Sequence, residues 1–137
     1  MVSKSHFEKV KSYLEYAAEQ KLSNVQDGET EEGVFVQPII VDNFGRDNKL
    51  FVEEIIGPVL SVTSFETLDE AIELANDTVY GLAASAYTGS LRNALRLSRE
   101  IRAGVVTVNC FGKGDTSTPF GGYKKSGFGG CDKSIGT

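Results

Sequence analysis

The 137-residue chain contains two cysteines and one histidine, and it has no long apolar run. The cysteines, Cys110 and Cys131, are too few for a disulfide framework and lie in no metal-binding motif, which favours a reducing compartment. No stretch approaches the roughly 20 apolar residues that span a membrane, and the N-terminus lacks the apolar core of a secretion signal. We therefore expect a soluble, cytoplasmic protein with no bound metal and no membrane contact.

Positive charge is scarce over most of the chain. Residues 1–103 hold 10 Lys/Arg and 17 Asp/Glu, a net charge of −7, whereas residues 104–137 hold 4 and 2, a net charge of +2. Because contact with phosphates requires clustered Lys and Arg, an acidic chain of this kind is a poor partner for nucleic acid. The weakly basic end either meets an anionic ligand or carries solvated lysines, and solvated lysines are the commoner case.

The first third of the chain predicts one helix, a polar loop and a strand. Ser5 and Glu8 form a capping-box pattern ahead of an amphipathic helix over 7–18, and His6 beside the cap is expected at the surface. Residues 21–33 are polar and acidic, as in a surface loop. The β-rich run 34–41 contains Pro38, which places the strand at a sheet edge or interrupts it.

From Val59 onward strands and helices alternate. Strands are expected at 59–65, 82–88 and 105–108, and helices begin at the capping box of Thr67 and at Gly89-Ser90. Leu91, Ala94, Leu95 and Ile101 mark the expected buried face of the second helix, and Ala103-Gly104 its C-cap. This order predicts an α/β fold with a mostly parallel sheet flanked by helices, in a single domain over 1–137. Ligands gather beyond the carboxyl ends of such strands, which makes the loop after Val108 a candidate site.

The stretch FVEEIIGPVL, residues 51–60, contains two adjacent carboxylates before a Gly-Pro break. Gly57 allows unusual backbone angles, and Pro58 fixes its own φ. A sharp turn here can hold Glu53 or Glu54 at the mouth of a pocket while the other carboxylate faces water. The alternative is a solvated acidic loop.

Residues 109–137 are rich in glycine, with Phe111, Phe120, Tyr123 and Phe128 interleaved, which indicates a loop that packs closely on other groups. Neither a phosphate loop nor a dinucleotide fingerprint fits its glycine spacing. Cys110 follows a strand and precedes this loop, but a nucleophile needs a positioned base and the chain's only histidine is His6. A buried structural cysteine is the favoured interpretation, and no complete catalytic set is present.

Four ordered segments resemble motifs of the NAD(P)-dependent aldehyde dehydrogenase superfamily. Residues 53–59, EEIIGPV, are similar to its E-E-x-F-G-P-V motif, and residues 76–84, NDTVYGLAA, to its N-x-x-x-Y-G-L-A motif. Residues 103–109, AGVVTVN, and 119–127, PFGGYKKSG, are similar to its A-G-x-x-x-x-N and P-F-G-G-x-K-x-S-G motifs. The segments 115–119 and 132–134 are similar to branches that act on amino-aldehydes and semialdehydes, such as γ-glutamyl-γ-aminobutyraldehyde dehydrogenases.

The resemblance implies roles for individual residues. Glu54 matches a glutamate that accepts hydrogen bonds from the nicotinamide ribose of NAD or NADP, and Ile56 stands where a phenylalanine packs near the nicotinamide ring. Asn109, Phe111 and Phe120 match the substrate-binding loop and aldehyde pocket. Cys110 matches a cysteine beside that loop and not the nucleophile.

The resemblance also implies that the catalytic cysteine, the general-base glutamate and the dinucleotide-binding domain precede the segment present here. We therefore expect a C-terminal part of the catalytic domain, inactive alone. In the whole enzyme a thiolate attacks the aldehyde, hydride passes to NAD(P) and water releases the acid. The alternative is a non-catalytic binding or interaction module that retains the fold. Exposed domain faces favour self-association, as a homo-oligomer or through those faces.

Overall fold

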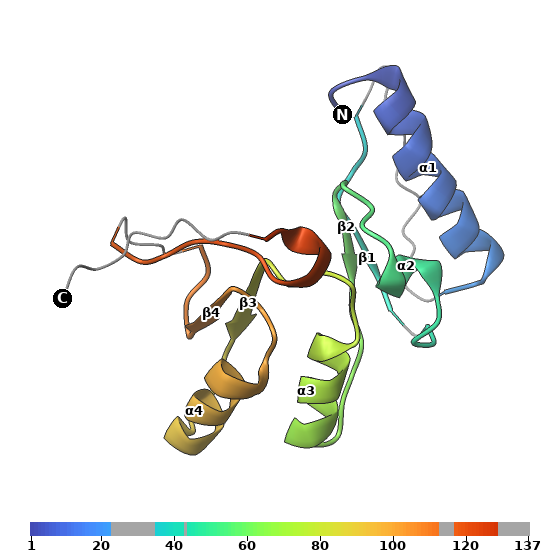
Figure 1. Ribbon diagram of the computed structural model, residues 1–137. Coiled ribbons are helices and arrows are strands. Elements are labelled where there is room, and N and C mark those ends of the chain that lie inside the picture. The colour runs from blue at the N-terminus through green and yellow to red at the C-terminus, as the bar shows by residue number, and fades with distance from the viewer. Residues whose placement is uncertain (23–34, 43, 113–116, 129–137) are drawn as a thin grey trace. The chain divides into compact units, whose positions relative to one another are not determined.

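The computed structural model describes residues 1–22, 35–42, 44–112 and 117–128, which belong to two units, Met1–Ser64 and Phe65–Thr137. Each unit contains helices and one pair of parallel strands (Figure 1). The predicted α/β class with parallel pairing is therefore confirmed, although the described strands form two separate two-stranded sheets. The assignment of residues 1–137 to a single domain stays a prediction.

The first unit contains α1 (Lys4–Glu19), β1 (Ile39–Val41), α2 (Lys49–Val52) and β2 (Val59–Ser61). β1 pairs with β2 in parallel, with Ile39 opposite Val59 and Val41 opposite Ser61. β1 begins directly after Pro38, which confirms the predicted interruption at the proline. The sequence pattern did not predict α2, a helix of only 4 residues in the crossover between the two strands. Its N-cap is Asn48, whose side chain accepts a hydrogen bond from the Leu50 amide.

The core of the first unit lies between α1 and residues of β1, α2 and the turn after α2. One face of α1 supplies Val10, Tyr13 and Ala17, which are buried together with Ile39, Val41, Leu50 and Ile55. The N-cap of α1 is Ser3, whose hydroxyl accepts the His6 amide at 3.2 Å. The prediction of Ser5 as the cap was wrong: Ser5 lies in the first turn of the helix, and its hydroxyl pairs with that of Ser3.

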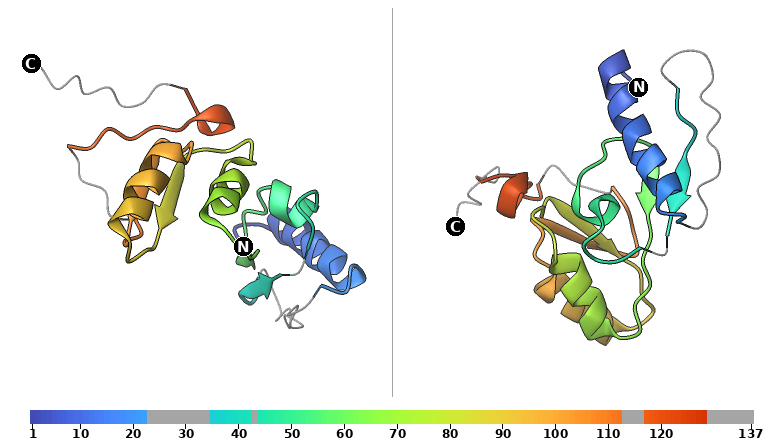
Figure 2. Two further views of the ribbon diagram at one scale, coloured as in Figure 1. Left: turned by 90° about the horizontal axis from the view of Figure 1, so that it is seen from below. Right: turned by 90° about the vertical axis from the view of Figure 1, so that its right-hand side faces the viewer.

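The second unit contains α3 (Leu68–Asn76), β3 (Ala83–Ala86), α4 (Leu91–Glu100), β4 (Val105–Val108) and the short 3₁₀ helix η1 (Lys124–Ser126). β3 pairs with β4 in parallel, with Ala83 opposite Val105 and Ala86 opposite Val108. Figure 2 shows α3 and α4 side by side. The predicted caps are confirmed, since the hydroxyls of Thr67 and Ser90 each accept the amide three residues later.

Two expectations for α4 were wrong. None of its residues is buried among the described residues, and Leu91 and Leu95 are 76% and 48% exposed. Gly104 is not its C-cap, because α4 ends at Glu100 and Ile101 is the cap, with an extended ψ of 125°. β4 follows, and its residues are half-buried. Gly104 has a different role, described below.

Several expectations fall outside the described residues. These are residues 23–33 of the polar, acidic loop predicted over 21–33, the start of the β-rich run at Val34, the segments 113–116 and 129–137, and Cys131. Within the described ranges, no helix combines the length and apolar character needed to cross a membrane.

Candidate functional site

The Glu53–Pro58 segment of the first unit forms a sharp turn, and its two carboxylates are in different environments. The Tyr13 hydroxyl donates to Glu53 Oε2 at 2.6 Å. Glu54 is exposed, and its carboxylate makes no hydrogen bond or ion pair with the described part of the chain. The structure thus ties Glu53 to the chain and leaves Glu54 exposed, and the expected position of one of them at the mouth of a pocket stays a prediction. The ribose role of Glu54 stays a prediction.

The unusual backbone angle in this turn belongs to Ile56 and not to Gly57. Ile56 has a φ of 56°, in the left-handed region that is unfavourable for a β-branched residue, and its side chain is 59% exposed. Gly57 is needed for space instead, since a Cβ there would lie 2.8 Å from Val10 Cγ2. The role of Ile56 beside a nicotinamide ring also stays a prediction.

The second unit has a cavity of about 420 Å³ over one region of its sheet. Its walls are residues 83–85 of β3, residues 105–107 of β4, and the loop residues Phe111, Gly112, Thr118, Pro119 and Phe120. The structure therefore brings together two of the predicted substrate-binding residues, Phe111 and Phe120. The cavity wall is mainly apolar, and the Ser85 and Thr107 hydroxyls on it pair with each other at 2.8 Å in the sheet.

The aromatic side chains of the glycine-rich end are not packed as predicted. Phe111, Phe120, Tyr123 and Phe128 are 82%, 57%, 57% and 100% exposed in the described structure. The close packing in this segment is made by its glycine backbone. The aromatic rings are consequently available to line a cavity or to meet groups outside the described residues.

Asn109 follows β4 with a φ of 55°, and its side chain makes hydrogen bonds to the backbone of another residue. Its Oδ1 accepts the Thr88 amide at 2.9 Å, and its Nδ2 donates to the Thr88 carbonyl at 3.0 Å. These bonds join the chain after β4 to the chain after β3. The structure thus gives Asn109 a local structural role, and its predicted substrate contact stays a prediction.

Cys110 is a free, half-buried thiol rather than the fully buried one expected. Its carbonyl accepts the Thr107 hydroxyl at 3.0 Å. No group of three or more His, Cys, Asp or Glu side chains in the described ranges is arranged to hold a metal ion.

Three of the motif-like segments meet in the second unit. The Gly81 carbonyl accepts the amides of Gly104 and Tyr123, at 3.0 and 2.8 Å. A Cβ on Gly104 would lie 1.7 Å from the Gly121 carbonyl oxygen, and one on Gly122 would lie 2.6 Å from the Ser126 carbonyl oxygen. We call these four residues, Gly81, Gly104, Gly121 and Gly122, the glycine junction. Because glycine has no side chain, backbone segments can approach one another here at distances that any side chain would prevent.

Two polar residues that sequence reasoning did not assign stabilise the ends of the helices. Asn76 donates from Nδ2 to the Glu100 carbonyl and accepts the Arg102 amide on Oδ1. The Lys124 ammonium donates to the carbonyls of Asn76 and Thr78, at 3.0 and 3.1 Å. A cation is favourable at the C-terminal end of a helix, here α3. Lys124 is thus exposed, and its ammonium is bound to backbone carbonyls of the chain.

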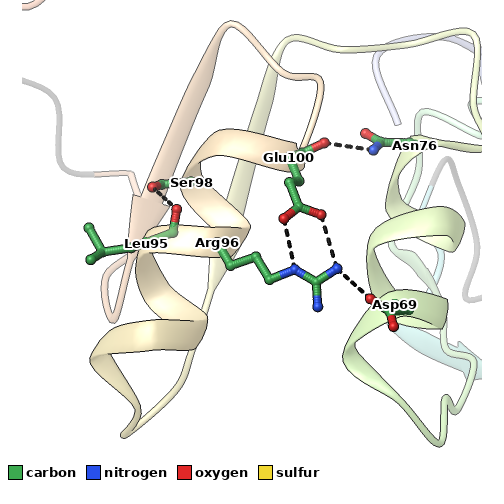
Figure 3. Close-up of polar contacts among 6 residues, drawn as sticks. All are labelled: Asp69, Asn76, Leu95, Arg96, Ser98 and Glu100. Atoms are coloured by element: carbon green, nitrogen blue, oxygen red, sulfur yellow. Dashed lines mark hydrogen bonds and ion pairs between the residues drawn. The ribbon is translucent and has the colours of Figure 1, made fainter.

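Arg96 links α4 to α3 through charged groups (Figure 3). Its Nε donates to Glu100 Oε1 at 2.7 Å, and its Nη2 contacts both Glu100 and Asp69. Hydrogen bonds to Glu100 and then Asp69 raise the pKa of Arg96 above its ordinary value. An open depression beside this network is lined by Ile72, Glu73, Asn76, Asp77, Arg99, Glu100 and Arg102.

The model of the aldehyde dehydrogenase family matches residues 1–136 of the chain. The chain belongs to the aldehyde dehydrogenase family. It is 68% identical over 135 residues to an aminoacetaldehyde dehydrogenase of Pseudomonas aeruginosa, covering 98% of this chain and 27% of that protein. It is 38% identical over 134 residues to aldehyde dehydrogenase [NAD(P)+] 1 of Saccharomyces cerevisiae, covering 94% of this chain and 26% of that protein.

Solved aldehyde dehydrogenases share the fold. A crystal structure of an indole-3-acetaldehyde dehydrogenase with NAD+ matches with a TM-score of 0.89 and 40% identity, over 95% of this chain and 27% of that one. The aldehyde dehydrogenase KauB from Pseudomonas aeruginosa matches with a TM-score of 0.88 and 41% identity, with the same coverage. The chain spans about a quarter of the length of these family members, as the 27% coverage states.

Proposed function

We propose that this chain is the C-terminal part of the catalytic region of an enzyme that oxidises aldehydes to carboxylic acids with NAD or NADP. The observation that carries the proposal is Glu54, an exposed carboxylate with no partner among the described residues, beside the tethered Glu53 in the EEIIGPV turn. A carboxylate that is free of protein partners can accept hydrogen bonds from two adjacent ribose hydroxyls. Ile56 offers an exposed apolar surface two residues away.

The nicotinamide cofactor, when bound, supplies the hydride acceptor for the oxidation. The residues of this chain fit a partial contact with it. Glu54 orients the ribose by accepting hydrogen bonds, and Ile56 excludes water from the ring side. In the second unit, Phe111 and Phe120 line a cavity of about 420 Å³ that we assign to the aldehyde. The family's chemistry also needs a nucleophile and a base, and we assign neither to this chain.

For the substrate class we propose a small amino-aldehyde. The 68% identity to an aminoacetaldehyde dehydrogenase supports this choice over larger aromatic aldehydes. We further propose a cytoplasmic location, supported by the scarcity of cysteine, and self-association through exposed apolar side chains such as Leu91 and Phe128.

The test replaces the matching segment of the Pseudomonas aeruginosa aminoacetaldehyde dehydrogenase by this chain. We expect the chimera to oxidise amino-aldehydes with NAD(P), and Glu54→Gln to raise the KM for the cofactor about 10-fold, as expected for a weakened charge-assisted hydrogen bond. The isolated 137-residue chain is expected to be inactive. A folded chimera without activity would contradict the proposal and favour a binding module without chemistry. Aldehyde oxidation by the isolated chain would show that the missing-nucleophile premise is wrong.

A further inference from the structure

The turn that presents Glu54 is held by one face of α1. Tyr13 donates to Glu53, and Ile55 is buried in the same cluster as Val10 and Tyr13. Farther along, His6 Nε2 lies 2.6 Å from the Ile56 carbonyl oxygen. Residues 53 to 57 thus run along α1 from Tyr13 towards His6, and the carboxylate of Glu54 makes no hydrogen bond or ion pair with the described residues.

His6 has a defined proton arrangement in this contact. A carbonyl oxygen only accepts hydrogen bonds, so Nε2 must carry the proton that it donates to Ile56. The other ring nitrogen, Nδ1, is shielded from solvent and has no hydrogen-bond partner among the described residues. The bond to Ile56 is therefore the polar contact that accounts for the position of the ring.

The hydrogen bond from His6 acts on the residue of the turn that has an unfavourable backbone conformation. Ile56 has a φ of 56°, which a β-branched residue adopts unfavourably, so the turn needs outside contacts to persist. The His6 bond acts on that same residue. On the other side of Glu54, the Tyr13 hydroxyl donates to Glu53, so Glu53 is the tethered member of the two adjacent carboxylates.

We propose that His6 and Tyr13 are positioning residues that fix the Glu53–Gly57 turn so that Glu54, and not Glu53, faces the cofactor ribose. This inference rests on the proposed function for the role of Glu54. The two side chains touch neither cofactor nor substrate; they act through the backbone of Ile56 and the carboxylate of Glu53.

The first test measures amide hydrogen exchange in the 137-residue chain. His6→Leu removes the donor, His6→Gln keeps an N–H at a similar reach, and Tyr13→Phe removes the hydroxyl. The Val59 and Ile39 amides donate to the carbonyls of Gly57 and Pro58, respectively, and report on the turn. We expect His6→Leu to speed the exchange of these two amides about 10-fold, while amides in the middle of α1 stay protected. His6→Gln should restore protection. An unchanged rate, or an equal rise throughout the unit, overturns the proposal.

A matched control is Tyr16→Phe, since the Tyr16 hydroxyl makes no hydrogen bond within the described residues and its ring keeps the contact with Lys49. It should leave the exchange of Val59 unchanged. A second measurement needs no variant: the ¹⁵N shifts of the imidazole in the native chain should show the proton of neutral His6 on Nε2. A proton on Nδ1 overturns the clamp even if His6→Leu fails to fold.

The kinetic reading uses the chimera described above. His6→Leu and Tyr13→Phe should raise the KM for NAD(P) about 5- to 10-fold with kcat within about 2-fold, and His6→Gln should recover the native KM. A fall in kcat with unchanged KM overturns the positioning role. If Glu54→Gln leaves KM unchanged while the exchange pattern is as expected, the ribose assignment has failed and the clamp on the turn stands.

Discussion

The two units hold their functional segments in opposite ways. In the first unit, side chains of α1 contact a turn, and one of the two carboxylates of the turn has no partner among the described residues. In the second unit, backbones touch directly at the glycine junction, and the neighbouring aromatic rings are left exposed. A turn held by side chains can lose one contact and keep the others. A junction of backbones has no room for even one added carbon, so we expect substitutions in the two units to differ sharply in cost.

The largest expected effect is that of Gly104→Ala in the glycine junction. Its Cβ would lie 1.7 Å from the Gly121 carbonyl oxygen, which is backbone and cannot swing aside. We expect a loss of about 3 kcal/mol or more in the free energy of unfolding, measured by urea unfolding followed by circular dichroism. Gly89→Ala is the control, since no atom lies within 4 Å of its added Cβ, and it should change stability by less than about 0.5 kcal/mol. Equal effects of the two substitutions would show that crowding at the glycine junction does not explain the need for Gly104.

Asn76→Ala tests the polar contacts of the same unit. It removes the bonds to the Glu100 carbonyl and the Arg102 amide, so two backbone groups lose their partner. The expected loss is about 2 kcal/mol in the same unfolding experiment. Asn93→Ala on α4 is the matched control, because the Asn93 side chain makes no hydrogen bond to the described residues. A loss below that of the control would mean that the ends of α3 and α4 are joined by other contacts.

In the first unit, the adjacent glutamates offer the same substitution in two environments. Glu53→Gln weakens the bond from Tyr13 because an amide oxygen accepts less strongly than a carboxylate, and we expect a loss of about 1 kcal/mol. Glu54→Gln should leave stability unchanged within about 0.3 kcal/mol, since Glu54 has no partner among the described residues. Thermal unfolding of the two variants distinguishes them. A larger loss of stability for Glu54→Gln than for Glu53→Gln would contradict the assignment of Glu53 as the tethered carboxylate.

The smallest effect is expected for Arg96→Met. The Arg96 network is exposed, and exposed ion pairs contribute little and weaken in salt. Because the pKa of Arg96 is raised, its contribution is present below its ordinary pKa and lost only as pH rises through the raised value. The small fall in the unfolding midpoint should therefore be the same at neutral and mildly alkaline pH, and smaller in about 1 M salt. A fall as large as that of Gly104→Ala would show that this exposed network contributes as much stability as the glycine junction.

The features that the sequence predicted well depend on neighbours along the chain. Thr67 caps α3 through an amide three residues away, and Pro38 stops β1 from starting earlier. The pattern at the start of α1 misidentified the cap, because Ser5 is followed three positions later by Glu8, as in a capping box, whereas Ser3 is followed by His6. The structure selects Ser3, and the hydroxyl of Ser5 turns to it.

The features that the sequence did not predict depend on distant partners. Gly104 stands where a C-cap would, yet its reason is Gly121. Lys124 finds its acceptors 48 and 46 residues away, at the end of α3, and no local pattern identifies them. His6 is likewise explained by Ile56, 50 residues later. For the candidate site, the motif resemblance identified Phe111 and Phe120, which the fold places in one cavity, while the helix that holds Glu54 in place has no motif of its own.

The glycine junction has a consequence for the order in which the chain folds. The Gly81 carbonyl accepts the amide of Gly104, just before β4, and the amide of Tyr123, which lies farther along the chain. Contacts between residues far apart in sequence form slowly, because the intervening chain must be ordered first. The segment around η1 should accordingly be the last part of the second unit to become protected. Pulsed hydrogen labelling during refolding should find the Tyr123 and Lys125 amides protected after those of β4, and simultaneous protection would show that the junction closes in one step with the sheet.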